Sequence, residues 1–133
     1  MKRVRRLIVS LAAAVFLAWL FFPQRPSEKL PPSAKNVKFA KNSFWQYWEY
    51  NLRFDADPEV CRSFAIDLIV KHGCSTSQII VEATQGHAFI GPAPRWMEAN
   101  QVTNGILLSG LGGWITAVVD KDRGRLYYRA GGY

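Results

Sequence analysis

Apolar and polar residues alternate from Trp48 to Phe54, a pattern typical of a β-strand with one buried face. The apolar side chains of this predicted strand share one face: Trp48, Tyr50, Leu52 and Phe54. Glu49, Asn51 and Arg53 fall on the other face, which we expect to meet solvent.

A helix is predicted directly after this strand. Asp57 suits an N-cap, Pro58 suits the first turn, and Glu59 places a negative charge near the helix start. Gly73 suits a helix stop, so we expect the helix to end at about His72. Its apolar stripe comprises Val60, Cys61, Phe64, Ala65, Leu68 and Ile69.

The remaining pattern favours strands. Residues 78–83 and 106–108 are apolar enough to be extended, and residues 87–90 suggest another short strand. Residues 114–119 are apolar on both faces, as in a central strand, and a glycine-containing turn joins them to an alternating segment over 125–129. The sequence therefore predicts a small α+β domain over residues 44–133, with one main helix packed on a mainly antiparallel sheet that ends in a β-hairpin.

The first 22 residues follow a different pattern. A cationic flank, residues 1–6, precedes an apolar run from Leu7 to Phe22 in which Ser10 is the one polar residue. This order is typical of a secretory signal or an uncleaved membrane anchor. Bulky residues close the run where a signal peptidase needs small ones, so we expect an uncleaved transmembrane signal-anchor helix over residues 7–22.

The predicted anchor is short for a bilayer. Its sixteen residues would extend about 24 Å as a helix, whereas a hydrocarbon core is about 30 Å thick. Snorkelling of Arg5 and Arg6 and local thinning of the bilayer would cover the difference. Five more cations follow the run, but those before it lie closest to it. We therefore expect a single-pass membrane protein with its C-terminal domain outside the cytoplasm, in the periplasm or extracellular space.

Residues 23–43 contain four of the seven prolines, with lysine, serine and asparagine between them. Proline prevents a helix, and this composition has little to bury. We expect residues 23–43 to form a semi-extended tether between the membrane and the domain. Its cations would lie in solvent or on anionic headgroups.

The net charge of +7 suggests a nucleic-acid-binding protein, but the charge is distributed unevenly along the chain. Residues 1–41 contain nine Lys and Arg against one acid, whereas residues 42–133 contain eight against nine acids. A nucleic-acid surface needs clustered cations on the folded part of a chain. We therefore expect no nucleic-acid partner.

The tripeptide His72-Gly73-Cys74 resembles the His-Gly-Cys core of the L,D-transpeptidases, envelope enzymes in which the cysteine attacks a peptide carbonyl. The resemblance implies Cys74 as a nucleophile. It covers three residues, because Lys71 stands where that family has serine and the two residues after Cys74 also differ. Gly73 as a helix stop and Cys74 as a small loop residue explain the same tripeptide, and a helix C-terminus disfavours a thiolate.

A wider Cys/His site is a second catalytic hypothesis. It would require Cys74, His72 and His87 to converge, with Glu82 or Asp67 as the orienting group. Nucleophilic catalysis needs a thiol and an imidazole within hydrogen-bond reach.

The two cysteines are not expected to pair. A continuous helix would separate Cys61 from Cys74 by about 20 Å along its axis. A disulfide needs Cα atoms within about 7 Å of each other.

Residues 120–124 have the D-x-D-x-G spacing of a calcium loop, but the twelfth position of an EF-hand is glycine here. We expect a hairpin turn instead, and no metal site. The glycines at 110, 112 and 113 lack the Lys-Ser/Thr that completes a phosphate-binding loop. No nucleotide or other cofactor is therefore expected.

Aromatic residues are densest between positions 45 and 50. Trp48 and Tyr50 belong to the predicted buried face, whereas Trp45 and Tyr47 fall on the other face beside Glu49. Exposed aromatic rings suit contacts with peptides or sugars. We therefore predict Trp45 and Tyr47 as binding residues.

Three function classes remain. The preferred one is a membrane-anchored, non-catalytic binding or assembly module of the cell envelope, with an envelope protein or glycan as partner. The second is a small subunit of a membrane complex, recognised through its anchor, where Ser10 and the alanines at 12–14 offer small and polar contacts. The third is a Cys/His-dependent envelope enzyme.

Overall fold

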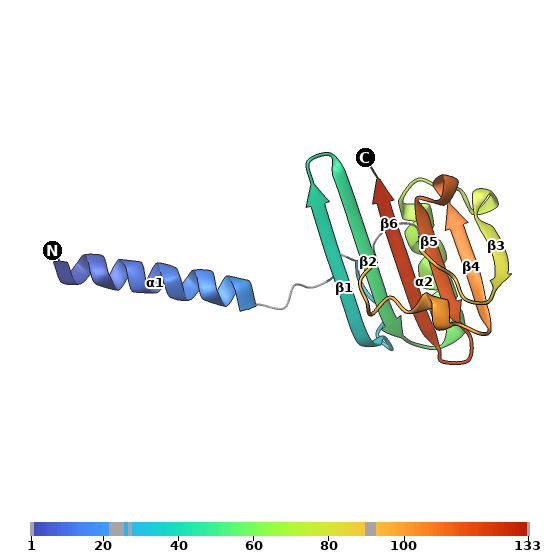
Figure 1. The fold of residues 1–133 in the computed structure, drawn as a ribbon, viewed down its shortest axis with the longest axis horizontal. Helices are drawn as coiled ribbons and strands as arrows, with labels where there is room; N and C mark the ends of the chain where they lie inside the picture. The colour runs from blue at the N-terminus through green and yellow to red at the C-terminus, as the bar shows by residue number, and fades with distance from the viewer. Residues whose placement is uncertain (1, 22–25, 27, 90–92, 133) are drawn as a thin grey trace.

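The protein has an α+β fold, which confirms the predicted class (Figure 1). The computed structural model describes residues 2–21, 26, 28–89 and 93–132. Helix α1 (Lys2–Phe21) lies apart from the sheet, and helix α2 (Pro58–Lys71) packs against it. The six strands are β1 (Lys35–Phe44), β2 (Tyr47–Asp55), β3 (Ile80–Thr84), β4 (Gly105–Gly110), β5 (Ile115–Asp120) and β6 (Arg125–Gly132).

All neighbouring strands of the sheet are antiparallel, in the order β1-β2-β6-β5-β4-β3. β5 lies in the interior of the sheet, and β5 and β6 form the predicted hairpin, with Gly124 at a φ of +62° in its turn. The pairing of β2 with β6 runs from Trp48 opposite Gly132 to Asp55 opposite Arg125. This pairing joins the first hairpin of the domain to the last.

Helix α2 has the predicted limits. The Asp57 side chain accepts a hydrogen bond from the Glu59 backbone N–H, and Gly73 follows the helix with a φ of +94°. A negative side chain at the N-terminus and a glycine past the C-terminus are the local signals that set these limits. The buried residues of the helix are Cys61, Ala65, Leu68 and Ile69.

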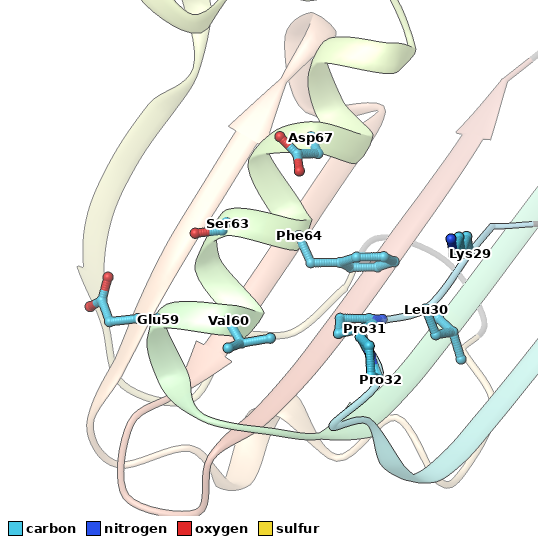
Figure 2. A pocket seen from close by; sticks show the side chains of 9 residues that line it. All are labelled: Lys29, Leu30, Pro31, Pro32, Glu59, Val60, Ser63, Phe64 and Asp67. Atoms are coloured by element: carbon cyan, nitrogen blue, oxygen red, sulfur yellow. The ribbon is translucent and has the colours of Figure 1, made fainter.

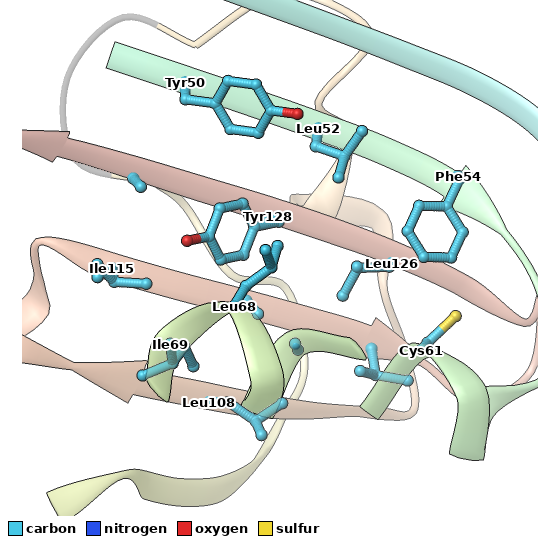
Figure 3. Packing of buried hydrophobic residues seen from close by; sticks show 14 of the residues in the cluster. Tyr50, Leu52, Phe54, Cys61, Leu68, Ile69, Leu108, Ile115, Leu126 and Tyr128 are labelled. Atoms are coloured by element: carbon cyan, nitrogen blue, oxygen red, sulfur yellow. The ribbon is translucent and has the colours of Figure 1, made fainter. Parts of the chain in front are cut away.

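The main core lies between α2 and one face of the sheet (Figure 3). Alternate residues of the central strands point into it, as the period of two requires. The strand residues buried there include Tyr50, Leu52, Phe54, Leu108, Ile115, Ala117, Val119, Leu126, Tyr128 and Ala130.

A second, smaller core covers the opposite face of the sheet. Met97 and Val102, from the connection between β3 and β4, pack there with Val118 and Tyr127. The expectation that the second face of β2 meets solvent is wrong, because Glu49, Asn51 and Arg53 are all buried. Arg53, for example, donates a hydrogen bond of 2.6 Å to the Trp96 carbonyl of this connection.

Two other segments differ from expectation. The structure places residues 35–43 in β1, where they pair with β2, and not in the tether. Leu30 and Ala34 are partly buried against the main core, so the proline-rich segment also contacts the domain. Residues 87–89 are not in a strand, and Ile90 lies outside the described residues.

Helix α1 presents its apolar residues to solvent. The side chains from Leu7 to Ala18 are exposed, and Leu7 and Val9 are each more than two-thirds exposed. Within the described part of the chain, no helix combines the length and the apolar character that crossing a membrane requires.

One ion pair connects β2 and β6 at the end of the sheet near the start of α2. Arg125 pairs with Asp55, and its Nη2 donates to Oδ2 at 3.1 Å; Asn36 donates to the same carboxylate at 2.9 Å. The hydrogen bonds from Arg125 lower the pKa of Asp55 below its ordinary value of 3.8. A carboxyl with a lowered folded-state pKa stabilises the fold above its unfolded pKa and loses that effect as the pH falls through the folded value.

We therefore expect the free energy of unfolding to fall as the pH drops below about 4, and Asp55→Asn to flatten this dependence. Urea unfolding at several pH values measures it. Asp67→Asn removes an exposed carboxylate and serves as the control. An equal flattening in both variants would contradict the assignment to the Asp55–Arg125 pair.

Candidate functional site

Exposed apolar side chains lie on two separate turns at one end of the sheet. The β1–β2 loop, the connection from β4 to β5 and the C-terminal end of β6 all lie at this end (Figure 1). Trp45 is 92% exposed, Trp114 is 50% exposed and Leu111 is 44% exposed. We call these three residues the aromatic rim. Gly131 of β6 connects to it by donating a 3.1 Å hydrogen bond to the Trp114 carbonyl.

Two residues of the aromatic rim have an unfavourable backbone conformation. Trp45 has a φ of +57° and Leu111 a φ of +51°, in the left-handed region that suits glycine or asparagine. Trp45 occupies a two-residue hairpin loop, because Phe44 pairs directly with Tyr47. Each such residue costs about 1–2 kcal/mol relative to ordinary backbone. A two-residue hairpin loop requires a positive φ, and Trp45 meets this requirement with a bulky, exposed side chain instead of glycine or asparagine.

A buried polar network lies next to the aromatic rim, on the sheet face opposite α2. Glu49 accepts hydrogen bonds from Asn51 Nδ2 at 2.5 Å and from the Tyr47 hydroxyl at 2.9 Å, and its Oε2 lies 3.3 Å from Arg129 Nη2. Arg129 also donates to Asn51 Oδ1 at 3.4 Å. The hydrogen bond to Glu49 raises the pKa of the Tyr47 phenol. Both charges are thus paired, which buried charges require.

This network holds the start of β2 against the end of β6. Tyr47 directly follows the loop that carries Trp45, and Trp48 stacks on His72 with ring centroids 6.0 Å apart. A Cβ added to Gly132 would lie 2.9 Å from the Trp48 indole nitrogen, so β6 approaches this ring closely. The strand that follows the Trp45 loop is therefore held by contacts on both faces of the sheet.

The structure separates the roles of the two predicted binding residues. Trp45 is exposed as predicted, but for a different reason: it lies in the β1–β2 loop, whereas the strand face to which the alternation assigned it is buried. Tyr47 is half-buried and bonded to Glu49, so it positions the loop. The sequence reasoning missed Leu111 and assigned Trp114 to the central strand, which begins one residue later, at Ile115. An apolar residue among the glycines at 110–113 was the available signal for Leu111.

Cys74 lies in the loop after α2, as expected, but its side chain belongs to the core. It is buried in the main core, its Sγ donates to the Ser75 carbonyl at 3.6 Å, and a Cβ added to Gly110 would lie 3.1 Å from that sulfur. Cys61 is also buried and free, and burial raises its pKa to about 11. The raised pKa disfavours a reactive thiolate at Cys61.

The histidines do not complete a site with Cys74. The His72 ring is stacked on Trp48. His87 belongs to the connection that covers the other face of the sheet. Its backbone N–H donates to the Ala99 carbonyl, and its ring contacts Phe89 edge-to-face. Desolvation lowers the pKa of His87. Since Cys74 lies on the α2 side, the sheet stands between Cys74 and His87.

An open groove of about 490 Å³ lies between the proline-rich segment and α2 (Figure 2). Figure 2 shows Pro31 and Pro32 facing Val60 and Phe64 of the helix, with Leu30 farther from it. Its other lining residues are Lys29, Glu59, Ser63 and Asp67. The lining includes neither cysteine nor histidine, and we interpret the groove as the contact that holds the proline-rich segment on the domain.

Carboxylates do not form a metal site in the described part of the chain, where no three Asp, Glu, His or Cys side chains gather in ligand geometry. The Asp120 carboxylate of the D-x-D-x-G segment instead accepts hydrogen bonds from the backbone N–H groups of Asp122 and Arg123. This is the hairpin turn that the sequence predicted.

Comparison with known protein families, curated proteins and solved structures finds no match for this chain.

Replacing Trp45 by glycine tests the strain in the β1–β2 loop. Because glycine adopts a positive φ freely, Trp45→Gly is expected to raise the free energy of unfolding by about 1 kcal/mol. Trp45→Ala keeps a Cβ at the same φ and is the matched control, for which we expect no gain. Urea unfolding of both variants measures the difference, and an equal response would contradict backbone strain at this position.

Thiol labelling tests the assignment of both cysteines to the core. We expect the folded protein to react with a disulfide reagent at pH 8 at least about 100-fold more slowly than the unfolded chain, because buried thiols react only when the structure opens. Cys61→Ala and Cys74→Ala isolate each thiol in turn. Rapid labelling of Cys74 in the folded protein would support the nucleophile hypothesis instead.

Proposed function

We propose that the protein is a membrane-anchored, non-catalytic binding module that presents the aromatic rim to an envelope partner outside the cytoplasm. The observation that carries this proposal is Trp45, which is 92% exposed on a backbone with a φ of +57°. Selection for stability alone would place glycine or asparagine at that position and a polar residue on that surface.

The partner is proposed to be a protein or a glycan. Indole rings offer flat apolar faces with a polar N–H, which suits both peptides and sugars. Trp45, Leu111 and Trp114 come from two turns, so the contact is a surface and not an enclosed pocket. The rigid polar base beneath Trp45 limits the conformational entropy that binding would cost.

Exposed apolar residues on α1 support the membrane anchor. The side chains from Leu7 to Ala18 are exposed to solvent in the isolated chain. Exposed aliphatic area of this kind is unfavourable in water, and a bilayer would cover it. The shortfall in length against a full bilayer is met by local thinning of the membrane.

A second candidate function uses the anchor itself for recognition. Ser10 and the alanines at 12–14 are exposed on α1, where small and hydroxyl-bearing residues would let another membrane helix approach closely. On this alternative the protein is a small subunit of a membrane complex, and the aromatic rim is not its contact surface.

Site-specific photo-crosslinking in cells distinguishes the two functions. A photoreactive phenylalanine is placed at Trp114 in the rim, at Ala13 in the anchor, or at Asp122 in the turn at the opposite end of the sheet. We expect one discrete crosslinked product from position 114 and none from position 122. Adding Trp45→Ala should reduce the product from position 114 at least about fivefold, since exposed aromatic anchors dominate such contacts.

A reporter enzyme fused after Tyr133, active only outside the cytoplasm, tests the location in parallel. An active reporter is expected. A discrete product from position 13 without one from position 114 would favour the subunit alternative. An inactive but well-expressed reporter would contradict the proposed location.

A further inference from the structure

The sheet has two edge strands, β1 and β3. They differ in the features that prevent an edge strand from pairing with another chain. β1 carries the exposed lysines Lys35, Lys38 and Lys41. Its pairing with β2 is interrupted by a register shift between Lys35 and Lys38. Lysines and irregular pairing are two of the features that prevent an edge strand from pairing with another chain.

β3 has neither of these features. It pairs with β4 over five residues, from Ile80 opposite Ser109 to Thr84 opposite Gly105, and no register shift interrupts the pairing. Ile80 is 57% exposed and Val81 is 47% exposed, although they point to opposite faces of the sheet. Among the described residues, no strand pairs with the outer side of β3.

We propose that β3 accepts an extended segment of a partner protein as a further strand of the sheet, with a basic side chain opposite Glu82. The outer backbone N–H and C=O groups of an edge strand repeat at the spacing of another polypeptide backbone. Side chains at alternate positions then meet Ile80 on one face and Val81 on the other. Glu82 is the one charged residue of β3 and is exposed, so it selects the charge of the incoming strand.

A second copy of this chain fits the β3 edge less well. An antiparallel pairing of two β3 strands that uses all five residues is centred on Glu82 and places the two carboxylates opposite each other. Like charges directly opposite in a sheet are destabilising. Five residues extend only about 17 Å, which is short for the interface of a stable dimer.

Two nine-residue peptides of alternating threonine and valine, one with a central lysine and one with a central glutamate, are the probes. They are titrated by fluorescence anisotropy against the full-length chain in lipid nanodiscs. We expect the lysine peptide to bind about twofold to fivefold more tightly than the glutamate peptide, as cross-strand charge pairs predict. Amide hydrogen exchange is expected to slow in residues 80–84 when the lysine peptide is bound.

Ile80→Lys places a lysine on β3, as β1 already has. We expect this substitution to lower the affinity for the lysine peptide at least about tenfold. Val37→Lys adds the same charge at an exposed residue of the other edge and should leave the affinity within about twofold. Glu82→Gln should remove the preference for lysine over glutamate. Trp45→Ala should leave the affinity for both peptides unchanged, which would separate the β3 edge from the aromatic rim.

The proposal would be overturned if Ile80→Lys and Val37→Lys weakened peptide binding equally, or if the peptide protected amides of β1. It would also be overturned if the lysine peptide did not bind at millimolar concentration. Sedimentation of the peptide-free chain gives a further check. A dimer that Ile80→Lys dissociates would show that a second copy, and not a partner strand, occupies β3.

Discussion

The antiparallel pairing of β2 with β6 is the contact on which the rest of the domain depends. It joins residues 48–55 to residues 125–132 and so places the first hairpin beside the last. Closing so long a stretch of chain costs entropy that local structure does not recover. The pairing is reinforced near both ends, by Asp55 with Arg125 at one and by Glu49 with Arg129 at the other. Loss of this contact would separate β1 and β2 from the core that α2 covers.

The Glu49–Arg129 pair does more for geometry than for net stability. Desolvating two charges offsets most of their attraction, so a buried pair of this kind is weak evidence of stabilisation. Its hydrogen bonds are directional, however, and Glu49 accepts from Tyr47 and Asn51 as well. Because Tyr47 lies two residues after Trp45, the network determines where the strained hairpin loop is presented. A stable base beneath a strained, exposed indole is a common arrangement at binding surfaces, where stability is lost locally and recovered elsewhere.

The aromatic rim, the β3 edge and α1 give the molecule three apolar surfaces with different physical character. The rim offers rigid rings, the edge offers a row of backbone donors and acceptors, and α1 offers continuous aliphatic area. These features suit different partners, namely a shaped protein or glycan surface, an extended peptide and a lipid phase. Attachment to a membrane would raise the effective concentration of the aromatic rim and the β3 edge near partners in the same membrane. Neither surface would then need a high affinity of its own.

Local signals in the sequence determined the α+β class, the limits of α2 and the β5–β6 hairpin, because caps, glycines and hydrophobic period act over a few residues. The exposure of Trp45 was also predicted, although it follows from the β1–β2 loop and not from the strand alternation. The tertiary structure alone decided that Glu49 and Arg53 are buried and that Leu111 and Trp114 join Trp45 at one end of the sheet. Those outcomes depend on the pairing of β2 with β6 and on the β3–β4 connection folding over the second face. Both are contacts between distant segments, and a pattern that repeats every two or four residues carries no information about them.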